Sequence, residues 1–292
     1  MTNILSGIMS WAKDEPSVRT ILMVGSKAQQ GKQDKFSDFD LSIFGNSFDF
    51  ITNDDWLEAI SPVILCIHDQ FKWGESSIPT RLTIFDDHTK VDFSFHPASL
   101  LLEMVSSQIL TPTYEAGYVV VLDKDKIADL LPKAKGQAYQ VLLPDKDAFN
   151  EAINEFWFEA YHIAKYLSRE DFWAAKSRDH DMKKWMLRML QWNAAANAPT
   201  PIKAKNEGRQ MQDWIRPEWF NALEACFSEW DALSQWKALG ISMKTFAILA
   251  RETATVLGYL YNEKPESGLR NYILQLNPYS HVNPKSKSNG NH

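Results

Sequence analysis

Cysteine, positive charge and long apolar runs are all scarce in this chain, and each scarcity excludes a class of protein. The 292 residues contain only two cysteines, Cys66 and Cys226, which lie far apart in apolar surroundings. This usage predicts reduced, buried thiols and no disulfide framework. No window approaches the roughly 20 apolar residues of a membrane span, and the amphipathic residues 1–12 lack the basic leader of a signal peptide. We therefore expect a cytoplasmic protein with no membrane partner.

The charge balance is slightly acidic. Lysine and arginine together number 31, against 37 aspartate and glutamate residues, which gives a net charge of −6. Proteins that bind duplex nucleic acid normally carry a basic stripe, so this balance argues against a nucleic-acid partner. It suits a cationic small molecule, although the charge by itself selects no function.

The first half of the chain has the pattern of a β-sheet with short helices. From Val18 to about Leu122, apolar and β-branched runs alternate with short helical segments. The turn at 86–89 predicts an antiparallel hairpin, which would bring Asp92 into the sheet near the strand that begins at Asp38. The expected strands are residues 19–24, 38–44, 63–67, 80–85, 90–95 and 118–122.

The second half changes to the 3.6-residue period of helices. This period runs from Asp145 to Leu167, from about residue 170 to 196, and from 217 to 261. The prediction is therefore an α+β protein. Its expected parts are a mixed β-sheet domain flanked by helices at 1–135, a helical-bundle domain at 136–276 and a disordered polar tail at 277–292.

Three aspartates in this pattern are suited to divalent metal ions. Asp38 and Asp40 lie in the alternating run Asp-Phe-Asp-Leu-Ser-Ile-Phe, where a period of two places both side chains on one face of the strand. Asp92 has the same kind of position in Lys-Val-Asp-Phe-Ser-Phe. Carboxylates seldom lie within apolar strands without a partner, because an unpaired buried charge is costly. Such oxygen ligands favour Mg²⁺, and two such ions would clamp the attacking and leaving oxygens of a phosphoryl or nucleotidyl transfer.

A glycine–serine pair upstream would complete such a site. The first strand ends at Gly25-Ser26, where glycine lets the backbone approach a ligand and leaves amides free for phosphate oxygens. The loop that follows carries Lys27, Lys32 and Lys35, which would balance the charge of a polyphosphate. An Asp-x-Asp pair alone is usually a solvated turn. Its combination with Gly-Ser and with a third aspartate inside another strand favours a nucleoside triphosphate site.

These residues resemble the aminoglycoside 6-adenylyltransferases of the polymerase-β-like nucleotidyltransferase superfamily. That family reads Gly-Ser-Arg-Ala and then Phe-Gln-Asp-Tyr-Asp or Phe-Gln-Asp-Phe-Asp, where this chain has Gly25-Ser26-Lys27-Ala28 and Phe36-Ser37-Asp38-Phe39-Asp40. The resemblance runs from about residue 15 to about residue 270. Further matching segments are 53–57, 85–87, 90–92, 122–125, 154–157, 187–189 and Trp192.

The resemblance implies an antibiotic-resistance enzyme. The implied reaction is Mg²⁺-dependent transfer of AMP from ATP to the 6-hydroxyl of streptomycin, with release of pyrophosphate. The partners would be ATP as co-substrate and a cationic antibiotic, in a monomer or a homodimer. Asp92 would be either a general base or a ligand of a second metal ion, and both roles stay open. The implied site residues are Asp38, Asp40 and Asp92 for catalysis and two Mg²⁺ ions, and Gly25, Ser26, Lys27 and Lys205 for ATP.

Two departures from the family pattern leave the acceptor open. Lys27 stands where the family usually has arginine, so the charge is kept but the planar fork is lost. Lys183-Lys184-Trp185 stands where some relatives have Arg-His-Glu. The alternatives are a nucleotidyltransferase for another aminoglycoside, a lincosamide or a protein hydroxyl, and a nucleotide-binding module that has lost turnover.

The helical half is expected to bind the acceptor. Glu155 and Trp157 lie in the matching segment 154–157, where Glu155 would meet a guanidinium or ammonium group and Trp157 would pack on a sugar ring or a cation. The competing interpretations are a solvated acidic stripe for Glu155 and a place in the core for Trp157. We interpret Asp179-His180-Asp181 as an exposed polar triplet and not as a metal site.

Overall fold

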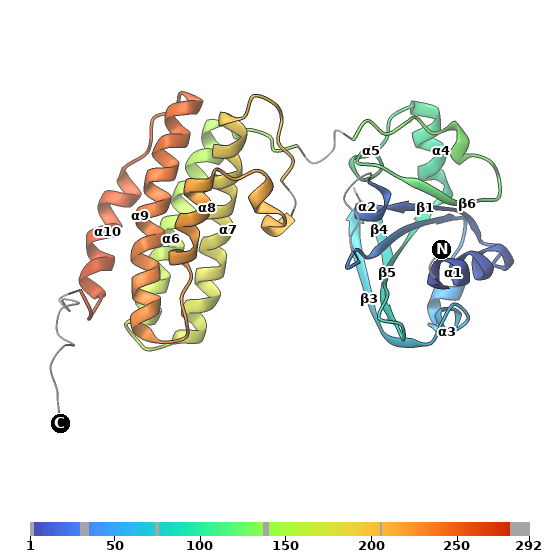
Figure 1. Ribbon diagram of the computed structural model, residues 1–292, viewed down its shortest axis with the longest axis horizontal. Helices are drawn as coiled ribbons and strands as arrows, with labels where there is room; N and C mark the ends of the chain where they lie inside the picture. Colours follow the sequence, from blue (N-terminus) through green and yellow to red (C-terminus); the bar gives the residue numbers. More distant parts are fainter. Residues whose placement is uncertain (1–2, 30–34, 74–75, 137–139, 205, 281–292) are drawn as a thin grey trace. The chain divides into compact units, whose positions relative to one another are not determined.

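The computed structural model describes residues 3–29, 35–73, 76–136, 140–204 and 206–280. It has the expected α+β composition and divides into two compact units, residues 1–138 and 139–292 (Figure 1). The first unit holds every named strand. Its elements are α1 (Asn3–Asp14), β1 (Val18–Val24), α2 (Gly25–Ala28), β2 (Phe39–Gly45), η1 (Asp49–Thr52), α3 (Asp55–Glu58), β3 (Val63–Trp73), β4 (Ser76–Phe85), β5 (Lys90–Pro97), α4 (Ala98–Ser107), α5 (Pro112–Glu115), β6 (Val119–Asp123) and η2 (Ala128–Leu130).

The six strands form one mixed sheet in the order β3-β4-β5-β2-β1-β6. Strands β2 and β5 run parallel, and the other neighbours are antiparallel. The predicted hairpin at 86–89 is confirmed, because β4 and β5 pair antiparallel on either side of it. The strand that carries Asp92 is therefore a direct neighbour of the strand that carries Asp40.

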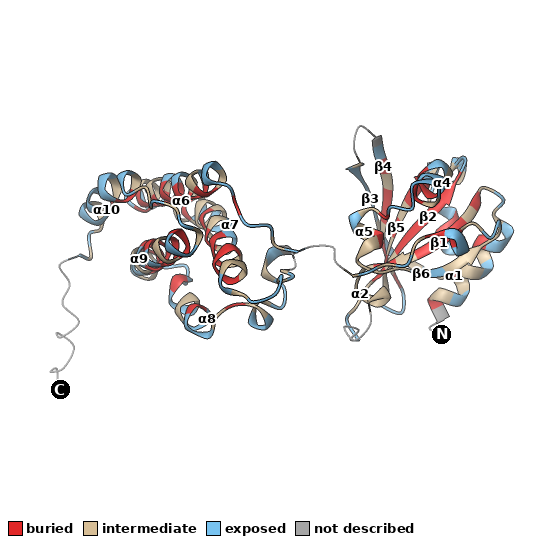
Figure 2. Ribbon diagram, turned by 90° about the horizontal axis from the view of Figure 1, so that it is seen from above, coloured by how far each residue is buried: buried red, intermediate tan, exposed pale blue. Residues whose placement is uncertain are grey.

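Each face of the sheet packs against its own pair of helices. One core cluster joins α1 and α3 to side chains such as Leu41 and Phe93, and the other joins α4 and α5 to side chains such as Leu22 and Phe44. Because side chains alternate along a strand, Asp40 belongs to the face that Phe44 shares with α4. Figure 2 shows buried residues along β1, β2 and β5.

The second unit is a bundle of helices around an apolar core. Phe156 and Phe246 stack there with ring centroids 3.7 Å apart. The helix that begins at Lys146 has a side-chain cap, since Asp145 accepts a hydrogen bond from the Ala148 amide at 2.8 Å. Its elements are α6 (Lys146–Leu167), α7 (Phe172–Asn197), η3 (Asn206–Gly208), η4 (Met211–Asp213), α8 (Pro217–Leu223), η5 (Glu224–Cys226), α9 (Ala232–Leu257) and α10 (Lys264–Leu276).

The structure corrects two expectations for this half. The helix expected over 217–261 is broken: α8 ends at Leu223, and α9 starts afresh where Asp231 accepts a hydrogen bond from the Ser234 amide. Helix α10 was not predicted, although its Ile273 is buried against the bundle. The expected disordered tail falls largely on residues 281–292, which lie outside the described residues; α10 itself extends to Leu276.

Only one of the two thiols is buried as expected. Both cysteines are free; Cys226 is buried, whereas Cys66 is only half-buried on β3. None of the helices in the described ranges is long and apolar enough to cross a bilayer.

Candidate functional site

The three aspartates converge where strands β1, β2 and β5 meet. Asp40 on β2 is the register partner of Asp92 on the parallel strand β5. On its other side Asp40 pairs with Val24, the last residue of β1. Asp38 directly precedes β2, so all three carboxylates lie at the same end of the neighbouring strands β2 and β5. The two strands predicted to bring them together are neighbours.

Lys90 joins two of these carboxylates. Its Nζ lies 2.7 Å from Oδ2 of Asp92 and 3.2 Å from Oδ2 of Asp38. Partial burial alone would lower the pKa of the Lys90 ammonium, but the hydrogen bonds and charges of Asp92 and Asp38 outweigh it and raise the pKa. Sequence reasoning missed Lys90 as a site residue. The signal was available, because residues 90 and 92 of one strand point to the same face.

The position of the Asp40 carboxylate requires a residue without a side chain at position 25. The glycine has φ +69°, in the left-handed region, and a Cβ built there would lie 1.9 Å from Oδ2 and 2.8 Å from Cγ of Asp40. A side chain at residue 25 would therefore occupy the space of the Asp40 carboxylate. The Gly25–Ser26 turn, which begins α2, thus packs against the acidic group that the sequence analysis assigned to the metal.

The residues present fit a divalent cation by their donor set. Oδ1 of Asp92 is buried and accepts no hydrogen bond within the described ranges of the chain. A carboxylate oxygen in that situation is costly unless a cation balances it. The donors are all carboxylate oxygens, the ligand type that Mg²⁺ prefers.

The predicted phosphate-binding residues are only partly described. Lys27 lies on α2 with its Nζ 4.3 Å from the centroid of the Phe39 ring, beside the strand that carries Asp40. Lys35 is exposed and lies over the ring of Phe36. Lys32 and Lys205 lie outside the described residues.

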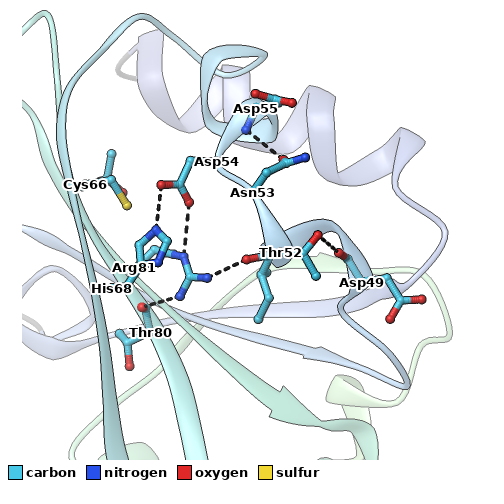
Figure 3. A network of polar contacts seen from close by, with 11 residues as sticks. Asp49, Thr52, Asn53, Asp54, Asp55, Cys66, His68, Thr80 and Arg81 are labelled. Atoms are coloured by element: carbon cyan, nitrogen blue, oxygen red, sulfur yellow. Dashed lines mark hydrogen bonds and ion pairs between the residues drawn. The ribbon is translucent and has the colours of Figure 1, made fainter.

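A second polar cluster joins Asp54, which precedes α3, to side chains of β3 and β4 at one end of the strand order (Figure 3). Asp54, Cys66 and His68 place a potential metal-ligand atom each within 4.8 Å of one another. Both oxygens of Asp54 are nevertheless engaged: Oδ2 lies 2.7 Å from Nε2 of His68, and Oδ1 lies 3.3 Å from Nε of Arg81. Thr83 donates to the Cys66 sulfur at 3.6 Å.

The contacts of Arg81 indicate a structural role for this cluster. The guanidinium is buried and donates to the Ile51 carbonyl at 2.6 Å and to the Thr80 carbonyl at 3.0 Å. Its charge already balances Asp54, and burial raises the pKa of the Cys66 thiol, which disfavours the thiolate that a metal needs. We assign the network to fastening the η1–α3 segment onto the sheet.

A comparison with known families decides the class of the protein. The family model described as "Streptomycin adenylyltransferase" matches residues 1–276. The chain belongs to this family. Membership makes it an enzyme of the nucleotidyltransferase class, in agreement with the resemblance noted in the sequence.

Individual proteins that are similar to this chain are distant in sequence but match over nearly its full length. An aminoglycoside 6-adenylyltransferase of Campylobacter jejuni is 24% identical over 278 residues, which are 92% of each protein. One of Staphylococcus aureus is 20% identical over 281 residues and covers 92% of this chain and 96% of that protein. The crystal structure of an aminoglycoside 6-adenyltransferase from Bacillus subtilis is similar with a TM-score of 0.46 and 20% identity, covering 94% of this chain and 97% of that one.

The predicted acceptor residues of this family member differ in exposure. Glu155 is partly exposed on α6. Trp157, by contrast, is fully buried, and its ring packs on Phe156 and lies 5.7 Å from the guanidinium of Arg270. No face of the indole is free for a sugar ring, so its burial favours the core interpretation.

The polar triplet on α7 is held by ion pairs within the helix. Asp179 lies 2.7 Å from Nζ of Lys183, and Asp181 lies 2.8 Å from Nζ of Lys184. His180 between them is exposed. These pairs agree with the interpretation of a polar triplet and give no indication of a metal site.

Proposed function

We propose that the protein transfers AMP from ATP to a hydroxyl group of an aminoglycoside, with the 6-hydroxyl of streptomycin as the expected acceptor. The observation that carries the proposal is the pairing of Asp40 with Asp92 on adjacent strands, with Asp38 directly before β2 and Gly25 packed on Asp40. Membership in the streptomycin adenylyltransferase family supports the reaction class. The expected location is the cytoplasm, where ATP is available.

Asp38, Asp40 and Asp92 would hold Mg²⁺, with two ions expected. Bound there, the metal would stabilise the charge that develops on the phosphate oxygens and on the departing pyrophosphate. Gly25 and Ser26 would offer backbone and hydroxyl donors to the triphosphate, and Lys27 and Lys205 would balance its charge.

At phosphorus the reaction makes one bond and breaks one, and the acceptor hydroxyl also loses its proton. The oxygen of the acceptor hydroxyl bonds to the α-phosphorus of ATP, and the bond from that phosphorus to the bridging oxygen of the pyrophosphate breaks. The proton of the hydroxyl goes to Asp92 if this residue is the general base, or to solvent if Asp92 is a metal ligand. The buried Oδ1 of Asp92 suits either role.

The acceptor would be recognised by charge. Glu155 is a partly exposed carboxylate in the segment that resembles the family, and it would pair with a guanidinium or ammonium of the antibiotic. The net charge of −6 is compatible with a cationic substrate. We do not propose a substrate contact for Trp157, because its ring is fully buried.

The test is pyrophosphate release in the presence of ATP and Mg²⁺, with streptomycin, spectinomycin, kanamycin and lincomycin compared as acceptors. Release with streptomycin alone is expected; release with another member of the panel would replace the acceptor and keep the reaction. Asp40→Asn is expected to lose nearly all activity while still binding ATP weakly. Asp129→Asn, a change at an exposed aspartate of the same unit, is the matched control. Full turnover by Asp40→Asn would overturn the metal assignment.

A further inference from the structure

The ammonium of Lys90 occupies the same oxygens that a metal ion would use. Its Nζ lies 2.7 Å from Oδ2 of Asp92 and 3.2 Å from Oδ2 of Asp38, so one side chain bridges two of the three carboxylates. Protein-bound Mg²⁺ demands oxygen ligands at about 2.0–2.1 Å in near-octahedral geometry. An ammonium that bridges both Oδ2 atoms therefore competes with a divalent ion for them.

Stability alone is a weak reason for such a bridge. All three side chains are partly exposed, at 35% for Lys90, 44% for Asp38 and 23% for Asp92, and ion pairs of this exposure stabilise a protein little. The bridge also leaves Oδ1 of Asp92 without a donor among the described residues. Lys90 therefore neutralises the site only in part, while it holds two carboxylates from different strands together.

We propose that Lys90 is an exchangeable internal cation of the active site. It holds Asp38 and Asp92 in place before metal binding and is displaced when a divalent ion takes their Oδ2 atoms. Its flexible four-carbon stem keeps the displaced ammonium beside the site, where it can pair with a phosphate oxygen of the nucleotide. This inference rests on the proposed metal-dependent function.

The test measures metal binding without nucleotide or acceptor. Mn²⁺ is titrated into the full chain, and the free ion is counted by electron paramagnetic resonance. Lys90→Met is expected to lower the Kd for Mn²⁺ about tenfold, since it removes a competing charge at hydrogen-bond distance from the ligands. Lys90→Arg keeps the charge and is expected to stay near the wild-type Kd. Lys13→Met removes the same charge from an exposed position on α1 of the same unit and is the matched control, with an expected change below about twofold.

Thermal unfolding adds a second readout that does not depend on affinity alone. In EDTA, Lys90→Met is expected to melt below the wild type, because Asp38 and Asp92 then repel each other. Mn²⁺ is expected to raise the melting temperature of Lys90→Met more than that of the wild type. A lysine with a purely structural role predicts a loss that Mn²⁺ does not repair.

The outcomes separate this inference from the proposed function. If the wild type binds Mn²⁺ but Lys90→Met binds it no tighter than Lys13→Met does, Lys90 is not displaced and the inference is wrong. If neither the wild type nor Lys90→Met binds Mn²⁺, the metal assignment itself fails and the inference fails with it.

Discussion

Replacement of Gly25 by alanine should separate the geometry of the site from the stability of the fold. The new Cβ would lie 1.9 Å from Oδ2, 2.8 Å from Cγ and 3.2 Å from Cβ of Asp40. Rotation of the Asp40 side chain can relieve the first two contacts, whereas the third is fixed by the backbone. The carboxylate must therefore leave its position, and the strand must shift by a few tenths of an ångström.

We expect Gly25→Ala to reduce the activity more than it reduces the stability of the fold. An alanine at φ +69° costs about 1–2 kcal/mol of unfolding free energy, because its Cβ crowds the following carbonyl. Activity should fall further, since a displacement of about 1 Å at a reacting centre costs on the order of a hundredfold in rate. We expect Gly25→Ala to reduce pyrophosphate release at least a hundredfold and to leave most of the protein folded.

Gly258→Ala is the matched control for this experiment. Gly258 follows α9 with φ +71°, and a Cβ there would meet nothing within 4 Å. It carries the same backbone strain without the contact to Asp40, so it should lose about the same stability and keep full activity. Urea unfolding and pyrophosphate release measured on both variants test the argument. Gly25→Ala with the activity of Gly258→Ala would refute it.

Two further changes test the first unit. His96 is buried, and burial lowers its pKa from 6.5 to about 4. The unfolding free energy that the neutral imidazole contributes is complete above pH 6.5. It is lost as the pH falls toward 4, by about 3 kcal/mol at most, because the unfolded chain takes up the proton first. The unfolding free energy of the wild type, measured by urea titration, should therefore fall relative to that of His96→Phe as the pH falls through this window, and parallel curves would contradict the assignment. Arg81→Met should lower the unfolding free energy by about 3 kcal/mol, since two backbone carbonyls lose their donor and Asp54 loses its cation; a loss below about 1 kcal/mol would show that the network is dispensable.

The sequence predicted the sheet better than the helices, for a physical reason. Asp40 and Asp92 could be placed together because a period of two fixes the face of each side chain, and the turn at 86–89 fixes the hairpin. The break between α8 and α9 was missed because apolar residues continue across it. The Asp231 cap was the available signal.

Contacts that depend on side-chain conformation could not be predicted from the sequence. The bridge from Lys90 to Asp38 joins residues 52 positions apart, and only the parallel register of β2 and β5 brings them together. The burial of Trp157 depends on how α10 packs, because Arg270 of that helix lies against the indole. Helix α10 itself was not predicted from the sequence.

The parallel pairing of β2 with β5 also has a consequence for the order of folding. In the sequence, β2 and β5 are separated by the whole β3–β4 hairpin, so their pairing closes a long loop. The entropy cost of closing this loop precedes the favourable contacts between the two strands. The acidic ligands therefore come together late, after the hairpin has formed. A metal ion that binds these aspartates should therefore slow unfolding far more than it accelerates folding. A nascent chain that ends before β5 lacks Asp92 and cannot bind the ion with all three aspartates.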